Sequence, residues 1–474
     1  MIIKATSFCP LILSSQTVYA RSPKVYRHTV NCLSAVYGRQ RSILFVHSCK
    51  LQQPFALALT VTAVPLSGAA TLPLHHRHGP CSPLTDKKMP TLEEMLRRDQ
   101  LRAAYIQRKF SSSDANGSAG DAQQSDATVP TNLGTYLNTL QYVISVSLGS
   151  PAMDQTVFID TGSDISWLQC EPCSQCHSQA DPLFDPSASS TYSPFSCSSD
   201  TCAQLGRQGN GCSSSQCQYI VRYVDGSSTT GTYSSDTLAL GSNTVSNFQF
   251  GCSDMESGLL LNDQTDGLMG LGGGTQSLVS QTTGTFGSAF SYCLPPTASS
   301  SGFLTLGAPT SGSFVTTPMI RFQNNPTFYG VRLEAIRVGG SQLNIPTSVF
   351  SAMTIMDSGT IVTRLPRTAY SALSSAFRDG MAQYPSAPPN GILDTCFDFS
   401  GQSSVTIPSV ALVFSGGAFV DLDYYGIMLE NCLAFAGNRD DYSSLNIIGN
   451  VQQRTFEVLY DVSGSTVGFR AAAC

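Results

Sequence analysis

Short apolar runs separated by turn-forming residues fill the chain from about residue 127 to its end. The segment Tyr142 to Leu148 alternates apolar and polar positions, which is typical of a half-buried strand, and Gly149-Ser150-Pro151 then turns the chain. Many such runs, with abundant Gly, Ser and Thr, predict an all-β fold with few short helices. One of these helices is expected on the surface at residues 370–381.

Two of the apolar runs end in an aspartate followed by small residues. Val157 to Ile159 leads into Asp160-Thr161-Gly162-Ser163, and Thr354 to Met356 leads into Asp357-Ser358-Gly359-Thr360. A single Asp at a strand end often does no more than start a turn. A glycine-broken apolar strand follows each copy, at 266–272 and at 446–450. The repetition favours a duplicated lobe, with two carboxylates brought face to face.

Paired carboxylates at these turns could act as general acid and general base together. Two carboxylates about 3 Å apart cannot both ionise, so they share one proton and titrate as a pair. The ionised member can take a proton from water, and the protonated member can donate a hydrogen bond to a carbonyl. Gly162 and Gly359 let the backbone approach the carboxylates. Hydrogen bonds within the turns or to the opposite loop are expected from the hydroxyls of Thr161, Ser163, Ser358 and Thr360.

Two aromatic residues are candidates for the walls of a cleft. Trp167, the only Trp in the protein, lies seven residues after Asp160 and is either a core aromatic or a cleft wall whose indole N–H has a partner. Residues 219–227 are two half-strands around Asp225-Gly226, which is a strong hairpin signal. With Tyr223 near its tip, this hairpin is either a lid over the cleft or a surface hairpin.

Charge divides the chain into two parts. Residues 1–126 hold 15 basic and 7 acidic residues, a balance of +8, whereas residues 127–474 hold 11 Arg, no Lys and 25 acidic residues, a balance of −14. Charged residues make up only 12% of the whole chain. The second part has the composition of a protein that tolerates acid, and its charge argues against a nucleic-acid partner. The plainer interpretation is an acidic, soluble surface.

Sixteen cysteines, twelve of them after residue 127, predict disulfides and an oxidising compartment. The spacing of Cys170, Cys173 and Cys176 superficially suggests zinc, but no second Cys/His pair has ligand spacing, so we expect no metal. Cross-links are expected to hold the segment 170–217, which also contains Cys197, Cys202, Cys212 and Cys217. In the second half Cys396 and Cys432 can pair locally, and Cys474 needs a distant partner such as Cys293.

The N-terminal 126 residues have the character of targeting and pro-sequence. Residues 1–70 contain two apolar runs, neither long enough for a confident membrane span, and fit a signal peptide, a plastid-type transit peptide, or a translation start nearer the second run. A helix is predicted from Pro90 to about Lys109, where Thr91 and Glu94 have capping-box spacing. A Ser/Gly-rich linker follows at 111–126. A basic helix before an acidic domain predicts a prosegment whose cations loosen from that domain when carboxylates protonate; the alternative is a helix that stays attached.

These motifs resemble the pepsin-like aspartic proteases, and most closely their plant branch with a cysteine-rich insert, typified by nepenthesins and the chloroplast-nucleoid protease. The resemblance covers roughly residues 127–474 and includes both Asp turns, Trp167, Asp266-Gly267 and Ile448-Gly449-Asn450. It extends to Leu72-Pro73-Leu74-His75-His76-Arg77-His78-Gly79-Pro80, which looks like that branch's prosegment. It implies a bilobal β protein with a prosegment and linker at 71–126, an N-terminal lobe at 127–310 with the insert 170–217 and a flap at 219–232, and a C-terminal lobe at 311–474.

The resemblance also implies roles for single residues. Asp160 and Asp357 would activate a water that attacks a peptide carbonyl, and Tyr223 occupies the position of the flap tyrosine. Ser163 and Thr360 would hydrogen-bond the outer oxygens of the two carboxylates, and Thr161 and Ser358 would hold the two turns together. Cross-links are implied within 170–217, with Cys176 reaching Cys252. No cofactor is implied. The flap departs from the family's usual Tyr-Gly-Asp-Gly-Ser because Val224 stands in place of the glycine, which restricts the backbone near the tip.

The leading hypothesis is an acid endopeptidase made as a zymogen, monomeric and acting on proteins or peptides. We expect it in the secretory pathway, outside the cell or in the vacuole, with the chloroplast as the alternative. A second hypothesis is a non-catalytic hydrolase inhibitor or binding protein with the same fold, which the two intact Asp turns disfavour. A third is a DNA-associated plastid protease, which only the basic N-terminal region could support.

Overall fold

The computed structural model describes residues 32–37, 44–49, 91–110, 127–133, 140–223, 227–262, 264–307, 313–442 and 444–474. The targeting runs, the motif at 72–80, the linker 111–126 and Val224 lie outside these ranges. Strands β1 (Cys32–Tyr37) and β2 (Leu44–Cys49) pair antiparallel in a unit of their own. Everything described below belongs to the second unit, which contains residues 84–474.

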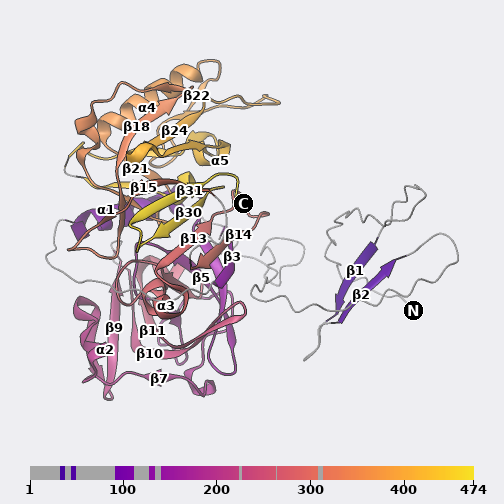
Figure 1. The fold of residues 1–474 in the computed structure, drawn as a ribbon, viewed down its shortest axis with the longest axis vertical. Helices are drawn as coiled ribbons and strands as arrows, with labels where there is room; N and C mark the ends of the chain where they lie inside the picture. Colours follow the sequence, from indigo (N-terminus) through magenta and orange to yellow (C-terminus); the bar gives the residue numbers. More distant parts are fainter. Residues whose placement is uncertain are drawn as a thin grey trace. The chain divides into compact units, whose positions relative to one another are not determined.

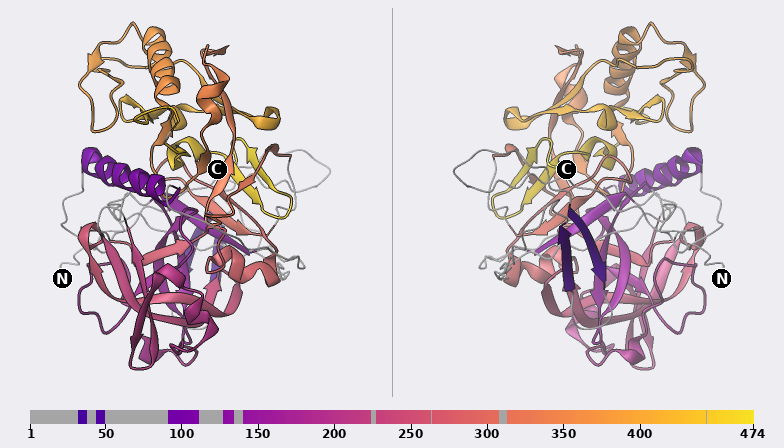
Figure 2. Two further views of the ribbon diagram at one scale, coloured as in Figure 1. Left: turned by 90° about the vertical axis from the view of Figure 1, so that its left-hand side faces the viewer. Right: turned by 90° about the vertical axis from the view of Figure 1, so that its right-hand side faces the viewer.

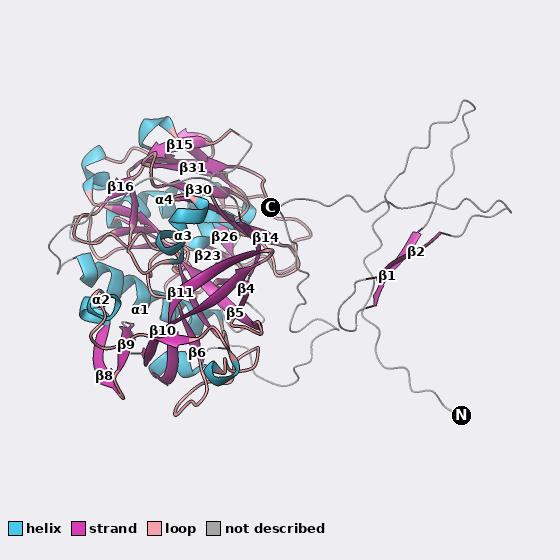
Figure 3. Cartoon of the chain, turned by 60° about the horizontal axis from the view of Figure 1, so that its bottom comes forward, coloured by secondary structure: helices cyan, strands magenta, loops and turns pink. Residues whose placement is uncertain are grey.

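This second unit is built mainly of short strands, as the apolar pattern predicts (Figure 3). Its first group is β3 (Ala127–Leu133), β4 (Tyr142–Leu148), β5 (Met153–Asp160), β6 (Trp167–Gln169), β7 (Ser193–Pro194), β8 (Gly209–Ser213), β9 (Gln216–Arg222), β10 (Ser228–Leu240), β11 (Asn243–Ser257), β12 (Gly267–Gly270), β13 (Ala289–Cys293) and β14 (Gly302–Leu306). The second group is β15 (Val315–Pro318), β16 (Ile320–Arg321), β17 (Tyr329–Val331), β18 (Leu333–Val338), β19 (Ser341–Gln342), β20 (Thr354–Met356), β21 (Thr363–Leu365), β22 (Ser386–Ala387), β23 (Cys396–Phe397), β24 (Val410–Phe414), β25 (Phe419–Leu422), β26 (Met428–Leu429), β27 (Cys432–Leu433), β28 (Phe435–Gly437), β29 (Asn446–Ile448), β30 (Glu457–Asp461) and β31 (Thr466–Arg470). The α-helices are α1 (Leu92–Phe110), α2 (Asp200–Ala203), α3 (Leu278–Phe286), α4 (Arg367–Gly380) and α5 (Tyr424–Ile427).

The two predicted lobes share one large sheet. Its order is β15-β31-β30-β13-β14-β3-β4-β5-β12-β6-β11-β10-β9-β8, so strands from the end of the chain pair with strands of the first half. In particular, β30 pairs antiparallel with β13. Smaller sheets of the C-terminal half include β16-β17-β20-β29-β21-β28. Figure 1 shows β30 and β31 between the C-terminal-half strands β18 and β24 and the N-terminal-half strands β9, β10 and β11.

Each Asp turn follows a strand that is buried between neighbours. β5 lies beside β12 in parallel, with Asp160 in register with Gly270. In the second half β20 lies beside β29 in parallel, with Met356 in register with Ile448. Parallel neighbours leave no face open to water, so these strands read as continuous apolar runs. The repeated sequence motif therefore has the same local strand arrangement in both halves.

Six disulfides connect the described residues: Cys170–Cys252, Cys173–Cys176, Cys197–Cys212, Cys202–Cys217, Cys293–Cys474 and Cys396–Cys432. The implied bond from Cys176 to Cys252 is wrong. β6 lies beside β11 with Leu168 in register with Cys252, so Cys170 at the end of β6 comes within 5.4 Å of Cys252 between Cα atoms. Cys176 lies further along the loop and bonds to Cys173 instead.

Helix α1 packs against the C-terminal half. It begins with the predicted capping box, in which the Thr91 N–H donates to Glu94 Oε2 at 2.7 Å and the Glu94 N–H donates to Thr91 Oγ1 at 3.2 Å. Its apolar face is buried by clusters that include Leu96 with Val362, and Ile106 with Phe328. Figure 2 shows α1 in purple crossing between the two halves. No helix within the described residues is long and apolar enough to cross a membrane.

Candidate active site

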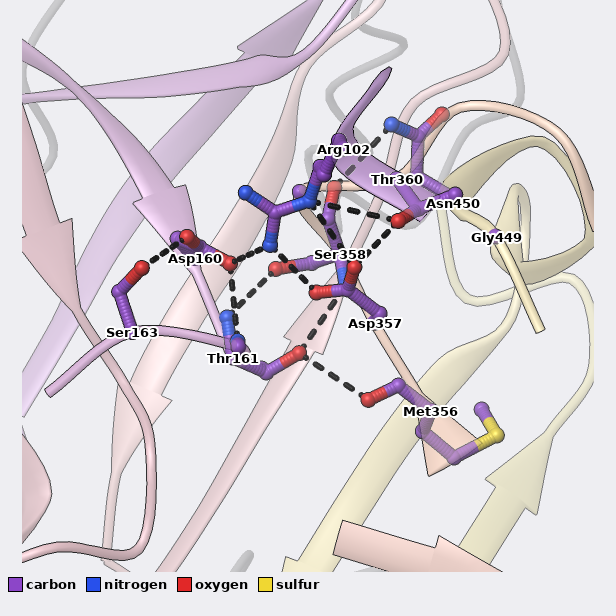
Figure 4. Close-up of polar contacts among 12 residues, drawn as sticks. Arg102, Asp160, Thr161, Ser163, Met356, Asp357, Ser358, Thr360, Gly449 and Asn450 are labelled. Carbon is purple, nitrogen blue, oxygen red and sulfur yellow. Dashed lines mark hydrogen bonds and ion pairs between the residues drawn. The ribbon is translucent and has the colours of Figure 1, made fainter. Parts of the chain in front are cut away.

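The two Asp turns meet and are held together by reciprocal hydrogen bonds (Figure 4). The Thr161 N–H donates to Ser358 Oγ at 3.0 Å, and the Ser358 N–H donates to Thr161 Oγ1 at 2.9 Å. The Ser358 hydroxyl in turn donates to the Ile159 carbonyl at 3.2 Å. All these groups are buried, where hydrogen bonds are strong and costly to leave unmade. Each turn therefore fixes the position of the other.

Each carboxylate is also held by a hydroxyl of its own turn. Ser163 Oγ donates to Asp160 Oδ2 at 2.5 Å, and Thr360 Oγ1 donates to Asp357 Oδ2. The Gly162 N–H donates to the other oxygen of Asp160, Oδ1, at 2.8 Å. Both aspartates are fully buried. The structure thus places Thr161, Ser163, Ser358 and Thr360 around Asp160 and Asp357.

A guanidinium from α1 occupies the space between the two carboxylates. Arg102 Nη2 donates to Asp160 Oδ1 at 2.5 Å and to Asp357 Oδ1 at 2.8 Å. Its Nε donates to Asp357 Oδ2 at 3.0 Å. The side chain of Arg102 is only 16% exposed. One arginine therefore bridges the pair. Its Nη2 binds the inner oxygen, Oδ1, of each aspartate, and its Nε binds the Asp357 oxygen that Thr360 also holds.

The two carboxylates differ in pKa. Burial alone raises the pKa of Asp160, but the charge of Arg102 and hydrogen bonds from Ser163, Arg102 and Gly162 bring it below its ordinary value. For Asp357, burial raises the pKa and Arg102 lowers it, while the nearby charge of Asp160 leaves the pKa above its ordinary value. Burial lowers the pKa of Arg102, but the two carboxylates raise it well above the usual value, so it stays charged. On acidification the first proton goes to Asp357.

Gly162 and Gly359 have no side chains, and this leaves the space in which Arg102 and the two carboxylates meet. A Cβ on Gly162 would lie 2.7 Å from Arg102 Nη2 and 2.7 Å from Asp357 Oδ1. A Cβ on Gly359 would lie 2.4 Å from Arg102 Nη2 and 2.6 Å from Asp160 Oδ1. A side chain at either position would fill the space between the carboxylates. The glycines therefore keep that space open for whatever group binds there.

The flap tyrosine and the tryptophan contact each other beside this site. The indole N–H of Trp167 donates to Tyr223 Oη at 2.8 Å, and Trp167 is 1% exposed. Tyr223 also lines a cavity of about 500 Å³ together with Ser163, Arg102 and Thr327. Trp167 packs in a buried cluster with Phe158 and Tyr219 and does not line this cavity, so it is a core aromatic whose indole N–H has a partner. The lid interpretation of the hairpin β9–β10 stays a prediction, because its turn at 224–226 lies outside the described residues.

Two residues of the site were not singled out by sequence reasoning. In the sequence Arg102 is one of several cations on the predicted helix, and nothing in its local pattern sets Asp99 apart from the other acidic residues. Both are on one face of α1, three residues apart. Arg102 reaches one aspartate of each half, and Asp99 binds Arg364 of the C-terminal half. That i, i+3 spacing was the available signal. The residues described here contain no cluster of His, Cys, Asp and Glu arranged to hold a metal ion.

Two halves of similar build, each supplying one buried aspartate turn to a shared cleft, define the pepsin-like class of aspartic protease. Comparison with known proteins agrees. The family models described as xylanase inhibitor N-terminal and xylanase inhibitor C-terminal match residues 142–308 and 328–471. An aspartyl protease family protein of Arabidopsis thaliana is 43% identical over 420 residues, covering 85% of this chain and 87% of that protein. Aspartic proteinase nepenthesin-2 of Nepenthes gracilis is 36% identical over 353 residues, covering 72% of this chain and 79% of its own.

Solved structures support the fold. The crystal structure of edgp matches with a TM-score of 0.60 at 20% identity, covering 74% of this chain and 96% of that one. The basic 7S globulin from soybean matches with a TM-score of 0.57 at 21% identity, covering 73% and 94%. At these identities the likeness shows the fold alone. Together with the curated relatives, it establishes that the chain belongs to the pepsin-like aspartic proteases, in their plant, nepenthesin-like branch.

Proposed function

We propose that the protein is an aspartic endopeptidase that hydrolyses peptide bonds at acidic pH through Asp160 and Asp357, and that it is made as a zymogen. The observation that carries the proposal is the arrangement of the two carboxylates. Their outer oxygens are held by Ser163 and Thr360, and their inner oxygens converge on one guanidinium nitrogen. A site that binds one nitrogen between two carboxylates has the geometry to bind one water molecule there.

The mechanism uses the pair as base and acid. Asp160, which receives the hydrogen bonds from Ser163 and Gly162, is the ionised member and takes a proton from the attacking water. Asp357, with the higher pKa, is the protonated member and donates to the carbonyl oxygen of the peptide. The water oxygen bonds to the carbonyl carbon to form a tetrahedral diol. Asp160 then gives its proton to the amide nitrogen while Asp357 takes a proton from a diol hydroxyl, so that the carbon–nitrogen bond breaks into a carboxylic acid and an amine, and both aspartates return to their starting states.

The zymogen part rests on α1. Arg102 sits on both carboxylates, so water and substrate have no room there while α1 is bound. The contact depends on negative charge, because a guanidinium donates but cannot accept a hydrogen bond. Protonation of the pair in acid removes the charge that holds Arg102. Loss of residues up to about 126 then leaves the cleft open.

The deciding experiment replaces each aspartate in the full chain. Asp160→Asn or Asp357→Asn should reduce hydrolysis of a protein substrate at acidic pH by at least about a thousandfold, since each carboxylate is needed in its own protonation state. Asp398→Asn, a change at an exposed carboxyl, serves as the control and should keep full activity. Full activity in either dyad variant would rule out this mechanism.

The alternative is a hydrolase inhibitor or binding protein on the same fold, which the descriptions of the matched family models favour. A transition-state mimic such as pepstatin separates the two functions. Tight binding after acid treatment supports the dyad mechanism, whereas absent binding together with inhibition of a glycosidase supports the alternative. We place the protein in the secretory pathway, because six disulfides need an oxidising compartment to form.

A further inference from the structure

Asp99 of α1 is held in a site built for a carboxylate. Its side chain is buried, with 3% of the residue exposed. The Ile361 N–H donates to Asp99 Oδ1 at 2.5 Å, and the Val362 N–H donates to Oδ2 at 3.4 Å. Arg364 Nη2 donates to Oδ2 at 2.8 Å. Two backbone N–H groups and a guanidinium thus surround one carboxylate, and all three donors belong to the C-terminal half rather than to α1.

Arg364 has further capacity to bind an acid. It lies on β21 and is itself buried, with 6% exposed. Its Nε is buried and makes no hydrogen bond to any residue that the structure describes. Nε and Nη2 form one edge of a guanidinium, and that edge matches the two oxygens of a carboxylate. Asp99 uses only the Nη2 half of this edge, so a slightly longer side chain has a second donor to reach.

A cavity of about 640 Å³ continues from Arg364. It is lined by Arg97 and Gln100 of α1 and by Arg364, Arg367, Tyr370 and Asp394 of the C-terminal half. When α1 leaves, Arg97 leaves with it, and the cations that remain are Arg364 and Arg367, opposed by Asp394. The cavity therefore offers room and positive charge beyond the place that the Asp99 carboxylate occupies.

The site adjoins the catalytic pair. Ile361 follows Thr360, which supports Asp357, directly in the chain. Asp99 and Arg102 are three residues apart on α1, which is about 4.5 Å along a helix axis. An extended peptide covers that distance in one to two residues at about 3.3 Å each. A substrate bound across the dyad therefore passes the carboxylate site within a few residues of its scissile bond.

We propose that Asp99 occupies an acid-binding subsite of the cleft, and that after α1 leaves this subsite takes a Glu or Asp side chain of the substrate. Arg364 and the N–H groups of Ile361 and Val362 are the donors. The inference rests on the proposed peptidase function, because the subsite binds a substrate side chain only if the cleft binds peptides. It identifies Arg364 as a specificity-determining residue and peptides with an acidic side chain near the cleavage point as preferred substrates.

The preference depends on pH in a defined direction. All the donors favour the ionised carboxylate, whose unperturbed pKa is about 4. The charged groups around the subsite are Arg364 and Arg367, with Asp394 across the cavity. The preference for an acidic peptide over its amide counterpart should be full at about pH 5, and it should shrink as the pH falls below about 4.

The test compares peptides that differ only in Glu against Gln, placed in turn at each position within three residues of the scissile bond. The full chain carries an inserted site for a site-specific protease between residues 111 and 126, so that after cutting, α1 is held only by its non-covalent contacts. One readout is kcat/KM at pH 5. The other is displacement of a fluorescent peptide with the sequence of residues 91–110, which needs no catalysis. Both are taken as Glu-to-Gln ratios within one preparation, so a partly folded variant does not distort them.

We expect the Glu peptide to be favoured at least tenfold at one position in both readouts. Arg364→Gln should bring the ratio to about one, and Arg364→Lys should keep only part of it, because lysine retains the charge without the two-pronged edge. Arg367→Gln removes a cation of the same cavity that makes no bond to Asp99, so it should lower the ratio far less than Arg364→Gln does. Equal ratios in the native sequence, or a preference that survives Arg364→Gln, would overturn the subsite. Absent hydrolysis of every peptide with the displacement preference intact would instead reject the peptidase function and leave the subsite standing.

Discussion

Nη2 of Arg102 lies 2.5 Å from Oδ1 of Asp160, and the same nitrogen reaches Asp357 at 2.8 Å. A buried charge is tolerated when it is paired and hydrogen-bonded. Here one positive group faces two acids, so the net charge of the cluster depends on whether Asp357 carries its proton. The stability of the α1 contact is therefore tied to the protonation of the two residues that α1 covers.

The first prediction concerns the pH at which α1 is released. The lowered pKa of Asp160 means that its contact with Arg102 is present above the ordinary pKa and is lost as pH falls through the lowered value. Arg102→Leu removes a charged hydrogen bond of about 1.5–3 kcal/mol, and about 1.4 kcal/mol corresponds to one pH unit. Half-maximal processing in a fixed time should then occur about one to two pH units higher, as followed by gel electrophoresis and N-terminal sequencing.

The matched control for this change is Arg97→Leu. Arg97 is exposed on the same helix and makes no described bond to either aspartate. It should process at the pH of the native chain. If Arg102→Leu also processes at the native pH, Arg102 does not hold the precursor closed.

The second prediction concerns the supporting hydroxyls. The hydrogen bond from Ser163 lowers the pKa of Asp160, so Ser163→Ala should raise it. The acid limb of the kcat/KM profile, where Asp160 becomes protonated, should move up by about one pH unit, since a hydrogen bond to a charged group contributes about 1.5–3 kcal/mol. Ser163→Thr keeps the hydroxyl, as Thr360 does in the other turn, and should leave the limb in place. A Ser163→Ala profile that overlays the native one would contradict this role.

The sequence was sufficient for the parts of the site that are local. Asp160 and Asp357 are visible because a buried parallel strand leaves a continuous apolar run, and a carboxylate after such a run is conspicuous. The capping box of α1 is visible because both partners lie within four residues. The all-β class follows from the same short-range patterns.

The remaining features depend on contacts between distant parts of the chain. Cys170 rather than Cys176 bonds Cys252 because of the register of β6 on β11, and the register that pairs two cysteines 82 residues apart cannot be seen in their spacing. The cation that reaches the dyad is Arg102 and not a neighbour, because the burial of Leu96 and Ile106 sets the rotation of α1. The sequence does not distinguish Arg364 from other strand residues, because its role depends on a hydrogen bond to Asp99, which is far away in the chain.

The third prediction tests the hydrogen bond between Tyr223 and the buried Trp167. Trp167→Phe removes the N–H that donates to Tyr223 Oη, and Tyr223→Phe removes the acceptor. A hydrogen bond of this kind contributes about 0.5–1.5 kcal/mol, so each single change should lower kcat/KM about two- to tenfold. If the two groups act through each other, the double variant should lose little more than the worse single variant. Losses that multiply would mean that the two residues act independently.

The last prediction concerns stability and a buried acid outside the dyad. Asp266 accepts hydrogen bonds from the Thr156 N–H at 2.5 Å and from the Asp181 N–H at 3.1 Å. The pKa of Asp266 is raised to about 9. The main cause is burial, and the Asp181 side chain adds to it through a hydrogen bond and through its charge. The folded state therefore binds a proton that the unfolded state releases near pH 4. The stability that this proton provides is complete below about pH 4 and is lost as pH rises toward 9.

Asp266→Asn replaces the neutral acid with a neutral amide that cannot ionise. The native chain should lose more thermal stability between pH 4 and pH 7.5 than this variant does. We expect the unfolding temperature of the native chain to fall by about 3 °C or more beyond the fall in Asp266→Asn, since 1 kcal/mol corresponds to about 2–4 °C. Asp398→Asn is the control, because hydrogen bonds from Ser400 lower the pKa of that exposed carboxyl and give the opposite dependence. Equal losses of unfolding temperature in the native chain and in Asp266→Asn would show that ionisation of Asp266 does not make the stability of the protein depend on pH.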